Sequence, residues 1–370
     1  HMVGLYRWSM TSKELFEKLS QKYNDASPDE KQGIVQFYRG WLEDPSAHSF
    51  EFSKGEDSVT IKNTLEQMIN RAKEDDLISQ QEVNELTKLL AGEENLPIRE
   101  NLDSEKEGYQ EKLDQLMSGQ LSEIQRQNLA SDFAQDLMAL QGKAISSIQL
   151  REFLKDGWTK GKKNKEITSP NAVKAVELRE KITHYVWMQV LKKDHEPAQR
   201  TGMIQFFMQV LNESLKSGDL NTAQGIRDAL GHGSVERLES SWENSLKTTM
   251  AGYKQRLSHE NNFKRIREEL SARAKALPFL QKDLKDIYGL NQSSLYDENG
   301  DVSPMKEKKY YASFQELKRS RRPFPSTELD VLSDLERVQK HIKDQIESDK
   351  KLNDIEDIVY TLSYAIRPRG

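Results

Sequence analysis

Apolar residues recur at three- and four-residue steps along most of the chain, which is the spacing of one face of an α-helix. The clearest run is the stretch LPFLQKDLKDIYGLNQ at 277–292, where Pro278 stands in the first turn, a position that needs no backbone N–H. A turn-rich passage and a second amphipathic run at 305–322 follow it. The pattern predicts a projecting pair of antiparallel helices. The apolar positions of the first helix are Leu277, Leu280, Leu284 and Ile287.

Capping boxes mark three helix starts near the beginning of the chain. In this motif a Ser or Thr and a Glu three residues later each bind the other's backbone N–H. The motif occurs at Thr11–Glu14, Ser27–Glu30 and Ser79–Glu82. Each box precedes apolar residues at helical spacing, so we predict that helices begin at these points.

The segment 91–119 is acidic and lacks strong apolar periodicity, which is typical of a connection. We therefore predict a helical domain over 3–90, a linker with a connecting helix over 91–120, and a second domain over 121–370. Stretches with the period-two alternation of β-strands are scarce. The predicted fold class is all-α.

The composition excludes several classes of function. The chain has no cysteine among its 370 residues, which excludes disulfides and thiolate metal sites and favours a reducing, cytoplasmic compartment. With 55 basic and 60 acidic residues and a net charge of -5, it has no global field for binding nucleic acid. No uninterrupted apolar run approaches the length of a membrane span. We expect a soluble protein, monomeric on its own, without stable membrane insertion.

A search for reactive groups finds few candidates. The seven histidines are scattered, and none forms a pair with metal-ligand spacing. No glycine-rich loop with the spacing of a phosphate cradle is present. The stretch 297–301 has its glycine in the wrong place for a calcium loop and is interpreted as a turn. We therefore predict no metal and no cofactor.

Eight short fragments follow one another along the second predicted domain. They are Trp158-Thr159-Lys160, Ser169-Pro170-Asn171, Arg200 with its apolar helix, Leu220-Asn221, Val235-x-Arg237-Leu238-x-x-x-Trp242, Asn262-Phe263-Lys264-x-x-Arg267, Leu277-Pro278-Phe279-Leu280 and Leu362-Ser363-x-x-Ile366-x-Pro368-Arg369. In their order and spacing they resemble the catalytic domain of Ras-family guanine-nucleotide exchange factors. The resemblance covers about 121–370, and the N-terminal stretch resembles more loosely the later part of the Ras exchanger motif domain.

This resemblance implies a function without covalent chemistry. Exchange factors of the family accelerate GDP release from a small GTPase of the Ras superfamily because they bind its nucleotide-free form better than the loaded form. The partner would be a Ras-, Rap- or Ral-like GTPase, and the hairpin over about 278–320 would act as a wedge in its switch region. A bacterial effector acting in the host cytosol would fit the divergence from the family pattern.

The resemblance also implies roles for particular residues. Phe279 would brace the base of the hairpin, Tyr288 would be pushed towards the Mg²⁺ site of the GTPase, and Gln292 would lie where nucleotide phosphate is displaced. The remaining positions would contact the switch regions of the GTPase. They are Trp158, Thr159, Val176, Glu177, Glu180, Gly231, His232, Asn262 and Phe263.

Alternatives stay open at several positions. Trp158 could cap the core, Phe279 could be ordinary packing and Tyr288 could be a surface aromatic. Gln292 lacks the negative charge usual at its position, so displacement there would be steric, or Glu298 would supply the acid. The alternative functions are a GTPase-binding domain without exchange activity and a helical scaffold.

Overall fold

The computed structural model describes residues 12–42, 56–91, 108–159, 169–273, 276–292, 303–318, 330–349 and 352–368. Every regular element in these ranges is a helix, which confirms the all-α prediction. The chain divides into two compact units. The first comprises His1–Ser104, Gln149–Pro170 and Ser293–Asp301; the second comprises Glu105–Ile148, Asn171–Gln292 and Val302–Gly370.

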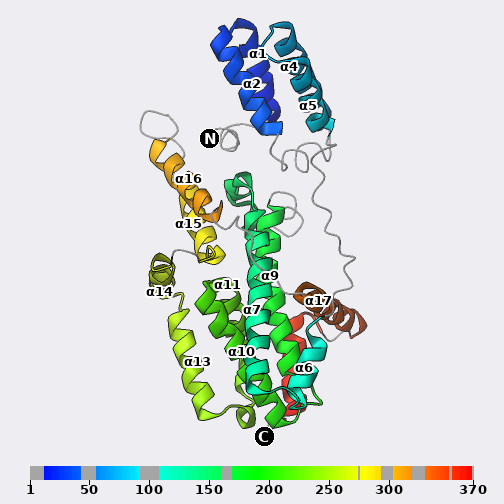
Figure 1. Ribbon diagram of the computed structural model, residues 1–370, viewed down its shortest axis with the longest axis vertical. Coiled ribbons are helices and arrows are strands. Elements are labelled where there is room, and N and C mark those ends of the chain that lie inside the picture. Colours follow the sequence, from blue (N-terminus) through cyan, green and yellow to red (C-terminus); the bar gives the residue numbers. More distant parts are fainter. Residues whose placement is uncertain are drawn as a thin grey trace. The chain divides into compact units, whose positions relative to one another are not determined.

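In its described residues, the first unit contains four α-helices around one small core (Figure 1, blue to teal). They are α1 (Ser12–Asp25), α2 (Pro28–Leu42), α4 (Glu56–Glu74) and α5 (Gln80–Ala91), with the 3-10 helix η3 at Leu150–Thr159. Helix α4 contacts the other three α-helices, and the Phe16 and Trp41 rings meet edge to face at 4.8 Å. The boxes predicted at Ser27 and Ser79 are formed, because each serine N–H donates to the glutamate three residues on. Thr11 lies outside the described residues.

The second unit is the larger one, and α10 lies at its centre. Helix α10 packs against α6, α7, α11 and the 3-10 helix η4. The helices up to η4 are α6 (Gln110–Met117), α7 (Glu123–Ser146), α9 (Pro170–Val190), α10 (Pro197–Ser217), α11 (Leu220–Leu230), α12 (Gly233–Glu236) and η4 (Glu239–Ser241). The later ones are α13 (Asn244–Arg256), α14 (Glu260–Ser271), α15 (Leu280–Gln292), α16 (Pro304–Lys318), α17 (Val331–Ser348) and α18 (Ile355–Ile366).

Helix α6 lies in the segment that the sequence assigns to the connection between domains. Its Leu113 and Leu116 are buried in the larger core. The backbone N–H of Tyr109, just before α6, donates to Asp334 of α17, and the Tyr109 hydroxyl donates to Asp136 of α7 at 2.6 Å. Two apolar residues are too few for a clear periodic signal in the sequence. The hydrogen bonds of Tyr109 to α17 and α7 add to the anchoring of α6.

Phe133 on α7 is the aromatic centre of the larger core. Its ring contacts Tyr109 edge to face at 4.6 Å, Tyr185 in a stacked arrangement at 5.8 Å, and Phe206 and Phe207 edge to face. These four rings come from α9, α10 and the segment before α6. Phe133 therefore joins elements that are far apart in the sequence.

Arg200 is a buried cation whose guanidinium forms hydrogen bonds with backbone carbonyl groups. It donates to the carbonyl oxygens of Val190, Lys192 and His195 at 3.1, 3.2 and 2.8 Å. Carbonyl groups at a helix C-terminus have no partner within the helix, so a guanidinium is well suited to satisfy them. Arg200 therefore fixes the connection between α9 and α10.

We predict that Phe133→Ala lowers the free energy of unfolding by about 3–5 kcal/mol, because it leaves a cavity among four aromatic rings. Urea unfolding followed by circular dichroism would measure this loss. Ile124→Ala, at a position on the same helix that is 71% exposed, is the matched control and should change stability by less than about 0.5 kcal/mol. Equal losses in the two variants would contradict the central role of Phe133.

Candidate functional site

Helices α15 and α16 pack against each other and form a helical hairpin within the second unit (Figure 1, yellow and orange). The four apolar positions predicted to share a face, from Leu277 to Ile287, are all buried. Tyr288, near the end of α15, is 44% exposed, and Met305, near the start of α16, is 66% exposed. Gln292 is exposed at the last position of α15, whereas Glu298 lies outside the described residues. The hairpin therefore has a buried base and exposed apolar side chains further along.

Asn221 of α11 anchors the base of this hairpin. Its side-chain Nδ2 donates to the Pro278 carbonyl oxygen at 2.9 Å, and its Oδ1 accepts from the Leu280 N–H at 3.0 Å. Asn221 is only 4% exposed, and a third bond runs from the Leu277 N–H to the Gly218 carbonyl oxygen at 3.0 Å. The first N–H groups of a helix have no partner within the helix. Asn221 thus caps α15 from a different helix.

The residues before Asn221 bring α11 close enough for this contact. Gly218 ends α10 with φ +90, and a Cβ there would lie 2.8 Å from the Cα of Ala276. Asp219 then caps α11, because its Oδ1 accepts from the N–H groups of Asn221 and Thr222. Burial raises the pKa of the Asp219 carboxyl, and these hydrogen bonds oppose the shift. Glycine is needed here both for its conformation and for the space.

Phe279 is 1% exposed and Phe263 is 3% exposed, and their rings meet edge to face at 5.9 Å. Lys285 of α15 places its ammonium 5.1 Å from the centre of the Phe263 ring. Phe279 therefore packs at the start of α15 and contacts α14 through Phe263.

A strained turn presents Phe263 to the hairpin. Asn261, Asn262 and Phe263 have φ of 48, 56 and 61, so three consecutive residues are left-handed. This conformation costs about 1–2 kcal/mol per residue, although asparagine tolerates it better than phenylalanine. Asn262 is exposed while Phe263 is buried, so the turn separates two neighbouring predicted site residues onto different surfaces.

Gly231 and His232 form the bend between α11 and α12. A Cβ at Gly231 would lie 2.9 Å from Lys254 Cε and 3.0 Å from the Arg227 carbonyl oxygen, which explains the glycine by space. The His232 ring lies between those of Trp187, at 4.8 Å, and Tyr360, at 5.3 Å. Its Nε2 donates to Glu356 of α18 at 3.0 Å.

His232, Ser234 and Glu356 have the residue types of a hydrolytic triad, but their geometry serves the fold. His232 Nδ1 accepts from the Ser234 N–H at 3.3 Å and so caps α12. The Ser234 hydroxyl lies 2.7 Å from the same nitrogen, yet Ser234 is fully buried. A nucleophile must reach its substrate, so the burial of Ser234 argues against a hydrolytic role for this group.

Of the predicted residues on α9, Val176 and Glu177 are half-buried, and Glu180 is exposed. The His184 ring stacks on that of Trp187 at 5.6 Å, and the Trp187 ring in turn contacts that of His232 at the bend. Burial lowers the pKa of His184, and the carboxylates of Glu180 and Glu356 act against that shift. The rings of His184, Trp187, His232 and Tyr360 therefore form one aromatic cluster.

Trp158 and Thr159 belong to η3 in the first unit. Trp158 is half-buried with its ring 6.0 Å from that of Phe153, and Thr159 is exposed and donates its hydroxyl to the Asp156 carbonyl oxygen. The predicted residues thus fall into two groups in the second unit. One lies on α14 and α15 at the base of the hairpin, and the other lies on α9 and the bend. Asn221, Glu356 and Tyr360 were given no role from sequence, because their contacts are distant in the chain.

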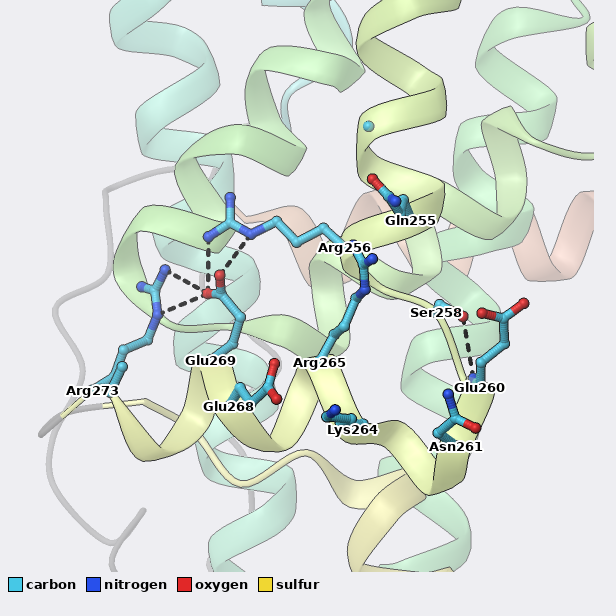
Figure 2. A pocket seen from close by; sticks show the side chains of 12 residues that line it. Gln255, Arg256, Ser258, Glu260, Asn261, Lys264, Arg265, Glu268, Glu269 and Arg273 are labelled. Carbon is cyan, nitrogen blue, oxygen red and sulfur yellow. Dashed lines mark hydrogen bonds and ion pairs between the residues drawn. The ribbon is translucent and has the colours of Figure 1, made fainter.

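A polar cleft of about 950 Å³ lies between α13 and α14. Figure 2 shows Glu269 held between Arg256 and Arg273, at 2.8 and 3.0 Å. The hydrogen bond from Arg256 lowers the pKa of the Glu269 carboxyl, and Arg273 adds to this effect. None of the predicted site residues lines the cleft. In the described part of the chain, no group of histidines and carboxylates is placed to hold a metal ion, and no helix is long and apolar enough to span a bilayer.

Comparison with known proteins gives a consistent result. Residues 132–316, half of the chain, match the RasGEF domain family. The chain is 23% identical over 225 residues to Ras guanine nucleotide exchange factor Q of Dictyostelium discoideum, covering 60% of this chain and 17% of that protein. It is 23% identical over 301 residues to RAS guanyl-releasing protein 2-B of Xenopus laevis, covering 78% and 46%. It is 25% identical over 245 residues to Ras-specific guanine nucleotide-releasing factor 2 of Rattus norvegicus, covering 65% and 20%.

The chain therefore belongs to the RasGEF domain family. It spans less than half of the length of these three relatives. The matched segment contains Asn221, the strained turn at 261–263, the whole of α15 and α16 up to residue 316.

We predict that Asn221→Ala loosens α15, because it leaves the buried Leu280 N–H and Pro278 carbonyl unpaired at a cost of about 1–3 kcal/mol each. Hydrogen exchange should show faster exchange of the α15 amides, while those of α10 keep their protection. Asn128→Ala, at an exposed position on α7, is the matched control. Unchanged protection of α15 in Asn221→Ala would contradict its anchoring role.

Proposed function

We propose that this protein is a guanine-nucleotide exchange factor for a small GTPase of the Ras superfamily, acting in the cytoplasm. The α15–α16 hairpin is the observation that carries the proposal. It has an anchored base, it presents Tyr288 at 44% exposure, and it lies in a chain of the RasGEF domain family. An anchored base and an exposed apolar group are what a wedge between the switch region and its nucleotide requires, and the family match supports this use of them.

The proposed mechanism uses contact energy and no covalent step. An exchange factor must bind the nucleotide-free GTPase better than the loaded form, because only a difference in affinity shifts an equilibrium. An acceleration of about ten-thousandfold corresponds to roughly 5.5 kcal/mol of preferential contact. A helical interface with several buried apolar side chains supplies energies of this order.

The proposed roles follow from exposure. Tyr288 is the apolar group that enters the Mg²⁺ site, and exposed, uncharged Gln292 displaces phosphate by its bulk. Phe279 and Phe263 are buried, and their proposed role is to support α15 by packing against it. Asn262 is exposed at the turn beside them.

The remaining proposed contacts lie on two other surfaces. Val176, Glu177 and Glu180 of α9, with Gly231 and His232 at the bend, contact the switch regions of the GTPase. Acidic residues at 177 and 180 favour a partner with basic side chains at the matching positions. Trp158 and Thr159 of η3 complete the proposed set.

We predict that the full chain accelerates release of fluorescent GDP from at least one member of a panel of Ras, Rap, Ral, Rab and Rho proteins. The measurement is the fluorescence decay with excess unlabelled nucleotide, and the control is the same GTPase without the chain. Stable binding to a nucleotide-free GTPase without acceleration would favour the GTPase-binding alternative. Absence of binding and acceleration across the panel would favour a scaffold.

We predict that Tyr288→Ala slows exchange at least tenfold on the responding GTPase, since loss of about 1.4 kcal/mol of contact gives a factor of about ten. The helical circular dichroism signal should be unchanged, because Tyr288 is exposed. Ile124→Ala is an exposed apolar control and should exchange at the wild-type rate. A wild-type rate for Tyr288→Ala would remove this residue from the mechanism.

A further inference from the structure

A buried lysine joins the two helices of the hairpin. Lys282, in the first turn of α15, is 5% exposed. Its ammonium pairs with Asp283 and lies 3.9 Å from Asp286 Oδ2 and 3.9 Å from Glu316 Oε1. Asp286 is one turn later on α15, whereas Glu316 is on α16. Lys282 thus has carboxylate partners on both helices.

Arg267 links the same group of charges to α14. Its guanidinium holds Asp286 with two hydrogen bonds of 2.8 and 2.6 Å. These bonds with Asp286 raise the pKa of Arg267. Asp286 is therefore shared between Arg267 of α14 and Lys282. We call Arg267, Lys282, Asp283, Asp286 and Glu316 the hairpin charge network.

Asp283 is the member of the network least compatible with a negative charge. It is 2% exposed, and its Oδ2 has no hydrogen-bond partner among the described residues. Burial raises the pKa of this carboxyl to about 7, although the neighbouring Lys282 ammonium acts in the opposite direction. The charged groups that face it are Lys282 and Asp286 on α15, Glu316 on α16 and Arg267 on α14.

Within the network, two cations face three carboxyl groups. The charges balance when one carboxyl holds a proton, and Asp283 is the group whose burial favours it. With Asp283 protonated, Lys282 is shared between Asp286 and Glu316. With Asp283 ionised, Lys282 is drawn to its own neighbour in the sequence, and the attraction to Glu316 is reduced.

We propose that the hairpin charge network sets the direction of α15 between α14 and α16, and that the proton on Asp283 controls how firmly Lys282 holds α16. The five side chains are positioning residues, because they act on a partner through the hairpin that carries Tyr288. The inference rests on the proposed exchange function.

The direction of the pH effect follows from the raised pKa. A carboxyl whose pKa is raised by folding holds its proton in the folded state while the unfolded chain has lost it. Its stabilising contribution is therefore complete at acidic pH and is lost as the pH rises through about 7. The hairpin is held most firmly on the acidic side of this value.

We expect the ratio of the wild-type exchange rate to the Asp283→Asn exchange rate, both at saturating GTPase, to decrease as the pH rises from about 6 to about 8. Asp283→Asn cannot titrate, so the ratio of the two rates removes the pH dependence of the GTPase itself. Parallel pH profiles for the two proteins would overturn the role of the Asp283 proton.

Glu316→Gln tests the link to α16 by a change that the fold tolerates, because Glu316 is 48% exposed. Loss of a partly exposed ion pair should lower kcat about two- to fivefold with KM unchanged, since the proposal gives Glu316 a role in positioning α16 and none in GTPase contact. Arg267→Gln should lower kcat further, and Arg265→Gln on the same helix is the matched control. Wild-type kcat in both Glu316→Gln and Arg267→Gln would overturn the positioning role.

A measurement without a GTPase separates this inference from the proposed function. Because the chain has no cysteine, Gly289→Cys on α15 and Ala312→Cys on α16 introduce unique sites for a pair of spin labels. A Cβ at Gly289 meets no atom within 4 Å, and Ala312 is exposed. The distance distribution should broaden as the pH rises in the wild-type background and stay constant with Asp283→Asn. A distance distribution without pH dependence in the wild-type background would overturn the proposed control of the hairpin by the Asp283 proton, even if the chain accelerates nucleotide exchange.

Discussion

The two hydrogen bonds from Asn221 to the start of α15 are the constraint on which the hairpin depends. Helices of about this length are marginally stable in water without tertiary contacts. Helix α15 has 13 residues, and its ordered start is a backbone segment paired with α11 rather than a local cap. Because buried backbone groups must be paired, loss of this contact would leave the Leu280 N–H unsatisfied. The Asn221 amide therefore fixes where α15 begins relative to α11.

Local patterns in the sequence predicted much of the fold, and the structure shows why. The spacing of Leu280, Leu284 and Ile287 identified the buried face of α15, and the boxes at Ser27 and Ser79 identified two helix starts, because these signals act within one or two turns. Asn221 meets Pro278 across 57 positions, and periodicity contains no information on such a contact. The left-handed turn at 261–263 has one local signal in the sequence, the Asn261-Asn262 pair, because asparagine adopts positive φ more readily than most residues. An interpretation of the whole segment as one helix misses this signal.

Distant fragments that carried the resemblance to the family meet in the structure. Arg237 donates to the carbonyl oxygen and the hydroxyl of Ser363, 126 positions away, and Trp242 donates to the Val235 carbonyl oxygen. These residues stabilise the packing of the second unit. The family pattern therefore identified the fold more directly than it identified the proposed contact surface, whose residues Tyr288, Glu180 and Asn262 are exposed.

The hairpin charge network is informative because buried ion pairs are poor sources of stability. Removing charges from water costs several kcal/mol per ion, and replacing a buried pair by apolar residues is often neutral or stabilising. Lys282 and Asp283 could therefore be replaced by a closely packed apolar pair at little cost to folding. Ion pairs do differ from apolar contacts in requiring particular partners, here Asp286 and Glu316, so they restrict the directions that α15 can take. For the proposed exchange, a hairpin of fixed direction loses less conformational entropy on meeting its partner than a mobile one, which leaves more of the contact energy for displacing nucleotide.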